Sequence, residues 1–84
     1  MKFSLITFRS VTPAQRGEQF LRRNGFICNL HRTPRFMQEQ GCGYCIRVKS
    51  ADVQPAVQLL RENGFPFRKV NLLRENGTAE ELSI

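Results

Sequence analysis

Residues 19–26 read QFLRRNGF and residues 58–65 read QLLRENGF, so one eight-residue pattern occurs twice, 39 residues apart. The two copies are identical at six of eight positions. In each copy a helical run ends at Asn-Gly, and glycine readily adopts the left-handed conformation that terminates a helix. A phenylalanine follows, where a strand is expected to begin. The chain therefore contains two helix-to-strand units, or uses the same efficient helix-stop sequence twice.

The segments around these two units complete the order of elements. Thr12 is a candidate N-cap with Pro13 at the first helical position, and Asp52 is a candidate cap for the second helix. Asn24-Gly25 and Asn63-Gly64 end the two helices. The stretch from Arg32 to Gly41 has no clean period and reads as a loop. Four runs read as strands: Phe3 to Phe8, Phe26 to His31, Tyr44 to Lys49 and Phe65 to Leu73.

This βαββαβ order predicts an α+β, ferredoxin-like fold, with a four-stranded antiparallel sheet and two helices on one face. A single domain is expected over residues 1–73, followed by a polar C-terminal tail at 74–84. In the third strand the side chains alternate between the two faces. Tyr44, Ile46 and Val48 are expected on one face, and Cys45, Arg47 and Lys49 on the other.

Composition and charge limit the function classes. The 84 residues are 40% hydrophobic and contain no apolar run long enough to span a membrane. So small a core leaves no room for a large cofactor, which argues against a complex enzyme. The net charge is +6, and residues 1–49 carry nine basic and two acidic side chains. This charge fits RNA, an acidic protein or an anionic small substrate as partner, or a basic surface that only faces solvent.

Cysteine usage points to thiol chemistry. Three cysteines are an odd number, which argues against a disulfide framework and favours the reducing cytoplasm. Cys42 lies between Gly41 and Gly43 in the predicted loop, at the same end of the sheet as the start of the first helix. The positive end of that helix would lower the pKa of the Cys42 thiol and favour the reactive thiolate. Three arginines are expected at the same end and would act in the same direction: Arg9, Arg32 and Arg35.

A reactive Cys42 thiolate would suit a nucleophile or a sulfur carrier. Three alternatives to this role remain open. Cys42 and Cys45 have the spacing of a dithiol pair, although Cys45 also suits a small sheet-face residue or a dimer contact. Cys28, His31, Cys42 and Cys45 form two close pairs that suit zinc, but Cys28 and His31 are expected on opposite faces of a strand, and His31 also fits an ordinary polar strand end. An RNA-binding module of the same element order carries aromatic side chains on its central strands, whereas the outward positions here are Cys45 and Arg47.

The ordered motifs resemble a small bacterial family of selenium/sulfur carrier protein-like sequences over about residues 3 to 72. The resemblance lies in a strand followed by a serine turn, an Ala-x-x-x-Glu helix, a glycine, a Pro-Arg loop, a Cys-Gly pair and a strand with arginine. The residues that carry it are Ser10, Ala14, Glu18, Leu21, Gly25, Pro34, Arg35, Cys42, Gly43 and Arg47.

The resemblance implies a carrier rather than an enzyme, with no cofactor. Cys42 would hold sulfur or selenium as a persulfide-type adduct, and Arg35 would bind the anionic group. Arg9, expected at the same end of the sheet, is a second candidate anion contact on the ground of its charge. Cys45 departs from the apolar residue expected at its position, which makes it a candidate resolving thiol. The implied partners are protein donors and acceptors of sulfur or selenium, acidic in view of the charge. A homodimer through the uncovered sheet face is a further expectation.

Overall fold

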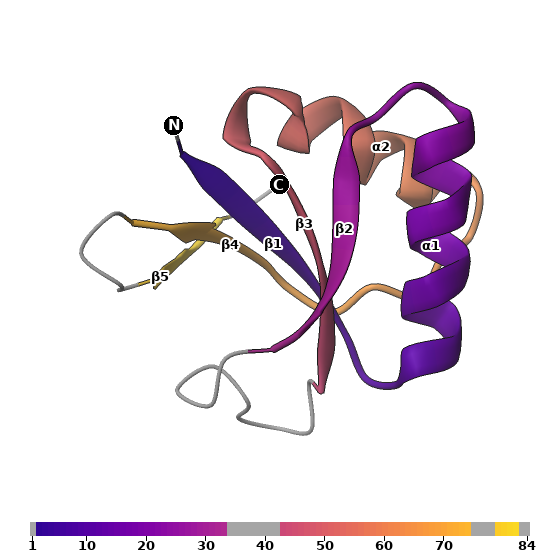
Figure 1. Ribbon diagram of the computed structural model, residues 1–84, viewed down its shortest axis with the longest axis horizontal. Helices are drawn as coiled ribbons and strands as arrows, with labels where there is room; N and C mark the ends of the chain where they lie inside the picture. Colours follow the sequence, from indigo (N-terminus) through magenta and orange to yellow (C-terminus); the bar gives the residue numbers. More distant parts are fainter. Residues whose placement is uncertain (1, 34–42, 75–78, 83–84) are drawn as a thin grey trace.

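The computed structural model describes residues 2–33, 43–74 and 79–82. It is an α+β structure with two α-helices and a five-stranded antiparallel sheet (Figure 1). The elements in chain order are β1 (Phe3–Phe8), α1 (Val11–Arg23), β2 (Cys28–Arg32), β3 (Tyr44–Lys49), the 3₁₀ turn η3 (Ser50–Asp52), α2 (Val53–Glu62), β4 (Val70–Leu73) and β5 (Ala79–Glu81). No helix among the described residues is both long and apolar enough to cross a membrane.

The strands lie in the order β2-β3-β1-β4-β5, and every neighbouring pair is antiparallel. In chain order, strands β1 to β4 and the two helices follow the predicted βαββαβ sequence of elements. The prediction of a four-stranded sheet was wrong by one strand, because β5 pairs with β4 at the sheet edge. The ferredoxin-like description therefore fits only part of the sheet.

The repeated eight-residue pattern is a pair of matching helix stops. Gly25 and Gly64 have φ angles of 90° and 74°, which only glycine adopts without strain. In both copies the phenylalanine after the glycine donates its backbone N–H back into the helix, to Leu21 in the first and Leu60 in the second, at 3.0 Å. The asparagine before the glycine donates its side-chain N–H to a carbonyl four residues earlier. The predicted ends of both helices are thus confirmed.

The predicted beginnings of some elements were displaced. Ser10, not Thr12, occupies the N-cap of α1, so the helix begins two residues earlier than expected. Strand β4 begins at Val70 rather than Phe65. The half-buried Phe65 and Phe67 pack against the core from a loop, and Pro66 has no N–H for a sheet ladder. Asp52 takes the predicted N-cap position of α2, without a side-chain cap bond.

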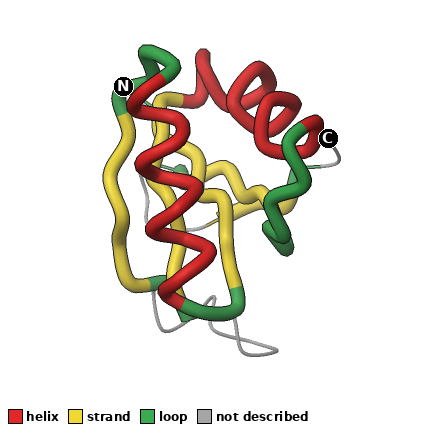
Figure 2. The backbone as a smooth tube through the Cα atoms, turned by 90° about the vertical axis from the view of Figure 1, so that its right-hand side faces the viewer, coloured by secondary structure: helices red, strands yellow, loops and turns green. Residues whose placement is uncertain are grey.

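The hydrophobic core lies between the sheet and the two helices, which cover the same face (Figure 2). Phe8, Ile6 and Ile46 from the sheet meet Leu21 of α1 and Leu60 of α2, all with no exposed surface. Gly17 lets α1 approach closely. A Cβ atom at that position would lie 3.1 Å from Ile46 Cδ1 and 3.2 Å from Phe8 Cζ.

Candidate functional site

Three strand ends meet at the end of the sheet where α1 begins. Phe8 at the end of β1 and Arg32 at the end of β2 both pair with Tyr44 at the start of β3. The described ends of the β2–β3 connection therefore lie at the same end of the sheet as the β1–α1 loop, as predicted (Figure 1). Gly41, Cys42 and Arg35 lie outside the described residues.

Gly43 anchors the end of the β2–β3 connection at this point. Its carbonyl accepts a hydrogen bond of 3.1 Å from the backbone N–H of Thr33. A Cβ atom at Gly43 would lie 3.9 Å from the backbone oxygen of Arg9. Among the described glycines only Gly25 and Gly64 have positive φ, and 3.9 Å is an ordinary van der Waals distance, so neither backbone conformation nor space requires glycine at position 43.

The charge at this end is positive. Arg9 and Arg32 are both exposed there, and the first turn of α1 contains no acidic residue. The first N–H groups of a helix have no partner within the helix and carry a partial positive charge. The Ser10 side chain at the N-cap does not accept a hydrogen bond from them. An anion at this end of the sheet would therefore be stabilised by both formal and partial charges.

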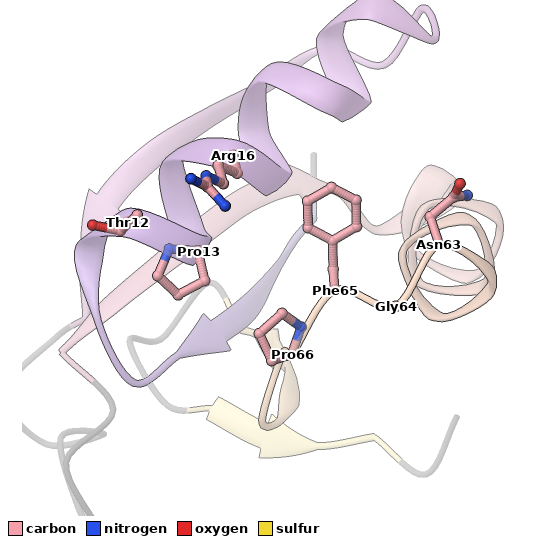
Figure 3. Close-up of a pocket in the computed structure, with 7 residues that line it drawn as sticks. All are labelled: Thr12, Pro13, Arg16, Asn63, Gly64, Phe65 and Pro66. Atoms are coloured by element: carbon pink, nitrogen blue, oxygen red, sulfur yellow. The ribbon is translucent and has the colours of Figure 1, made fainter.

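Beside Arg9, two adjoining hollows separate the start of α1 from the loop between α2 and β4. One has a volume of about 460 Å³ and is lined by Arg9, Ser10, Pro13, Pro66, Phe67 and Arg68. The other, drawn in Figure 3, has a volume of about 250 Å³ and is lined by Thr12, Pro13, Arg16, Asn63, Gly64, Phe65 and Pro66. Pro13 and Pro66 face each other at the boundary and line both hollows. We call the two together the α1 groove.

Cys45 lies on the sheet face opposite the helices, as its alternation with Ile46 predicted. It pairs with Thr7 of β1 and His31 of β2, and none of its surface is exposed. Burial raises the pKa of the Cys45 thiol to about 11, and a hydrogen bond with the Thr33 side chain opposes part of this rise. Cys45 is therefore protonated and inaccessible at neutral pH.

Cys28 lies on the other face, in the core beneath α1. Its Sγ atom donates to the backbone oxygen of Glu18 across 3.7 Å. Burial raises the pKa of the Cys28 thiol, and the Glu18 carboxylate raises it further, although Arg22 acts in the opposite direction. Both described cysteines are free, and both are poor nucleophiles near neutrality.

The two faces also separate the ligands of the zinc alternative. Cys28 points toward α1, whereas His31 pairs directly with Cys45 on the opposite side of the sheet. One zinc ion cannot reach both faces of a packed sheet. Across residues 2–33, 43–74 and 79–82 no group of three or more candidate metal ligands is assembled.

The outward sheet face offers little to a nucleic acid. Its aromatic side chain on β1 is Phe3, and the Arg47 guanidinium lies 3.8 Å above the centre of that ring. Tyr44 packs on the core side. The ring that a base would stack on is therefore already covered by a cation from the same sheet.

Two groups of residues have contacts or positions that were not predicted from the sequence. Glu18 and Arg22 reach from α1 to the edge strand β2, where Glu18 accepts from the backbone N–H of Leu30 and Arg22 donates to the carbonyl of Cys28. For Glu18, the Ala-x-x-x-Glu motif was the feature of the sequence that could have indicated this contact. Arg16 and Arg68 of the α1 groove are 52 residues apart, and no local pattern connects them.

The structure is that of a small α+β protein with a cationic sheet end, where the β2–β3 connection ends at Gly43. The chain belongs to the family described as putative Se/S carrier protein-like, whose model matches residues 3–78. No significant match was found among curated proteins or among solved structures.

The structure explains most residues on which the family resemblance rests. Ala14 and Leu21 are the buried residues of α1 that face the core, Gly25 ends α1, and Glu18 accepts a hydrogen bond from β2. Arg47 covers Phe3. Pro34, Arg35 and Cys42 are left without a structural explanation of this kind, since they lie outside the described residues.

Proposed function

We propose that this protein carries sulfur or selenium on Cys42 as a persulfide-type adduct. The Cys42 thiolate attacks the terminal sulfur of a donor persulfide. A new S–S bond forms at Cys42, the donor S–S bond breaks, and the donor leaves as a thiolate. The transferred atom is a sulfane sulfur, so the exchange needs no external oxidant. Delivery to an acceptor is the same step in reverse, and the equivalent exchange applies to selenium.

The observation that carries the proposal is the position of Gly43 beside Arg9 at the cationic end of the sheet. Cys42 is bonded to Gly43, and consecutive Cα atoms lie about 3.8 Å apart. The exposed Arg9 and Arg32 side chains and the start of α1 lie at this end of the sheet, and positive charge of this kind favours a thiolate over the neutral thiol. Any lowering of the pKa of the Cys42 thiol would raise the fraction of thiolate, the reactive form, at neutral pH.

The other two cysteines support the assignment by contrast. Cys28 and Cys45 are 3% and 0% exposed, and both have raised pKa values. Thiolate chemistry near neutral pH therefore falls to Cys42. The burial of Cys45 favours its role as a sheet residue over that of a resolving thiol, and a Cys45→Ser variant separates these roles.

A carrier also fits the surroundings better than an enzyme. Among the described residues, the charged side chains at this end of the sheet are Arg9 and Arg32, while Tyr44 packs against the core and His31 pairs with Cys45 on the outward sheet face. Arginine stays charged at all working pH values and orients an anion without exchanging protons. Such a carrier acts together with donor and acceptor proteins. We place it in the reducing cytoplasm, where free thiols persist.

The test is alkylation of the reduced protein between pH 5 and 10, read peptide by peptide by mass spectrometry. Cys42 is expected to react fastest at pH 6.5, and after incubation with a persulfide donor its peptide gains the mass of one sulfur. Cys42→Ser is expected to abolish the gain and Cys45→Ser to leave it unchanged. If Cys42 reacts no faster than Cys28 and takes up no sulfur, the proposal is wrong.

A further inference from the structure

The α1 groove combines a cationic rim with an apolar lining. Arg9, Arg16 and Arg68 are all exposed, and no acidic residue lines either hollow. None of the three arginines forms an ion pair with another described residue. Arg9 and Arg68 line one hollow and Arg16 lines the adjoining one, so an acidic ligand in the groove would meet several positive charges.

The middle of the groove is apolar. Pro13 and Pro66 form its narrow middle, and Figure 3 shows the Phe65 ring beside them, with Arg16 reaching from α1 on the same side. Phe65 packs against Phe20 with ring centres 5.0 Å apart, so its position is fixed from below. A groove of this kind accepts an apolar side chain without a large rearrangement.

The groove adjoins the proposed carrier site. Arg9 contributes its side chain to the wider hollow, and its backbone oxygen lies beside Gly43. A ligand in the groove would therefore lie next to the end of the sheet where Cys42 joins Gly43.

We propose that the α1 groove binds an extended, acidic segment of the donor or acceptor protein, with an apolar side chain between Pro13 and Pro66. This inference rests on the proposed function, because it names the chemistry by which a partner is held beside Cys42. Charge complementarity selects the acidic residues of the segment, and the apolar lining selects at least one apolar residue among them.

The aromatic residues of the groove favour a peptide over a nucleic acid. Phe65 and Phe67 are half-buried and pack against the core. Phe65 contacts Phe20, and the Arg61 guanidinium lies 5.7 Å from the centre of the Phe67 ring. Neither ring is a free platform for a base, whereas single-strand binding relies on such platforms.

The probe is a fluorescein-labelled eight-residue peptide, Gly-Glu-Asp-Phe-Glu-Asp-Leu-Gly, which is about 26 Å long when extended. Binding to the full-length protein is followed by fluorescence anisotropy at low salt. Amide chemical shifts map the bound surface, and the largest changes are expected at Arg16, Gly64, Phe65 and Arg68. A peptide with serine in place of Phe and Leu is expected to bind more weakly, and one with lysine in place of the acidic residues is expected not to bind.

Three matched variants each remove one positive charge. Arg16→Gln and Arg68→Gln are each expected to weaken peptide binding about two- to fivefold, as for a single exposed charge contact. Arg23→Gln, at the far end of α1, is the control and is expected to leave binding unchanged. Equal affinities for all three variants, or shifts confined to another surface, would overturn the docking proposal. Tighter binding of a single-stranded RNA of ten nucleotides, weakened by Arg16→Gln, would overturn it in favour of nucleic acid.

The Cys42→Ser variant keeps the two proposals distinguishable. It is expected to bind the acidic peptide as the unchanged protein does, while taking up no sulfur. Peptide binding without sulfur uptake by the unchanged protein would contradict the carrier function and leave the docking surface. Sulfur uptake without peptide binding would contradict only the docking surface.

Discussion

Glu18 of α1 accepts a hydrogen bond from the backbone N–H of Leu30 on the edge strand β2. The Glu18 side chain is only 18% exposed, and Arg22 one helical turn later donates to the Cys28 carbonyl of the same strand. Two side chains of one helix thus bind the outward backbone groups of the sheet edge. The contact fixes the angle of α1 over the sheet.

Removing this contact should destabilise the fold. Glu18→Ala leaves the Leu30 N–H without its charged acceptor, and we expect the free energy of unfolding to fall by about 1.5–3 kcal/mol. Urea denaturation measures the change. Glu62→Ala removes a carboxylate at the exposed end of α2 and should have almost no effect. Equal losses in both variants would show that the Leu30 contact is not the cause.

The buried Cys45 should make stability depend on alkaline pH. Its pKa of about 11 in the folded protein lies above the ordinary value of 9.0, so the folded state keeps a proton that the unfolded state releases. The stability linked to this proton is present below pH 9 and is lost as the pH rises from 9 to 11, by at most about 3 kcal/mol. Thermal unfolding of the protein and of Cys45→Ala between pH 7 and 11 isolates the contribution. Parallel pH profiles for the two proteins would contradict the prediction.

The two helix stops should respond alike to substitution. At Gly25 and Gly64 a Cβ atom meets no other atom within 4 Å, so the cost of Gly→Ala is conformational rather than steric. We expect each alanine variant to lose about 1–2 kcal/mol of stability. Gly25→Asn and Gly64→Asn should lose less, because asparagine tolerates positive φ better. Chemical denaturation of the four variants tests this order, and an asparagine variant less stable than its alanine counterpart would refute it.

Gly17 should be sensitive to side-chain size. Its Cβ position faces Ile46 and Phe8 at 3.1 and 3.2 Å, so a large side chain must push α1 away from the sheet. We expect Gly17→Leu to cost about 1–3 kcal/mol or more. Gly17→Ala should change stability far less, because better helix propensity offsets the close contact. The urea concentrations at the unfolding midpoints compare the stabilities of the two variants, provided that the denaturant slope m is unchanged. A leucine variant as stable as the unchanged protein would show that α1 can move away from the sheet without cost.

The sequence predicted those parts of the fold that local chemistry determines. Asn24-Gly25 and Asn63-Gly64 end their helices because a left-handed residue is a local requirement. The alternation around Cys45 placed its side chain on the correct face. By contrast, β5 was missed because Ala-Glu-Glu has no strand-like pattern, and it is held by backbone pairing with β4 and by ion pairs of Glu80 with Arg74 and Glu81 with Lys69.

The candidate site was less accessible to sequence reasoning for a different physical reason. The end of the sheet that joins Arg9 and Gly43 followed from the order of elements. The α1 groove did not, because Arg16 and Arg68 meet only after α1 and the α2–β4 loop pack together. The helical start at Val11 also escaped prediction, because Pro13 favours a helix that begins after Thr12, although serine is the better N-cap by residue type.

The hydrogen bonds of Glu18 and Arg22 with the backbone of the edge strand β2 have a consequence for association between molecules. An uncovered strand edge invites the same strand of another molecule, and repeated pairing builds open filaments. Here the side chains of α1 occupy backbone groups of one edge, while the other edge, β5, has three residues and two exposed glutamates. Neither border of the sheet is a template for polymerisation. Two copies of this chain would therefore meet through their broad surfaces rather than by extending each other's sheet.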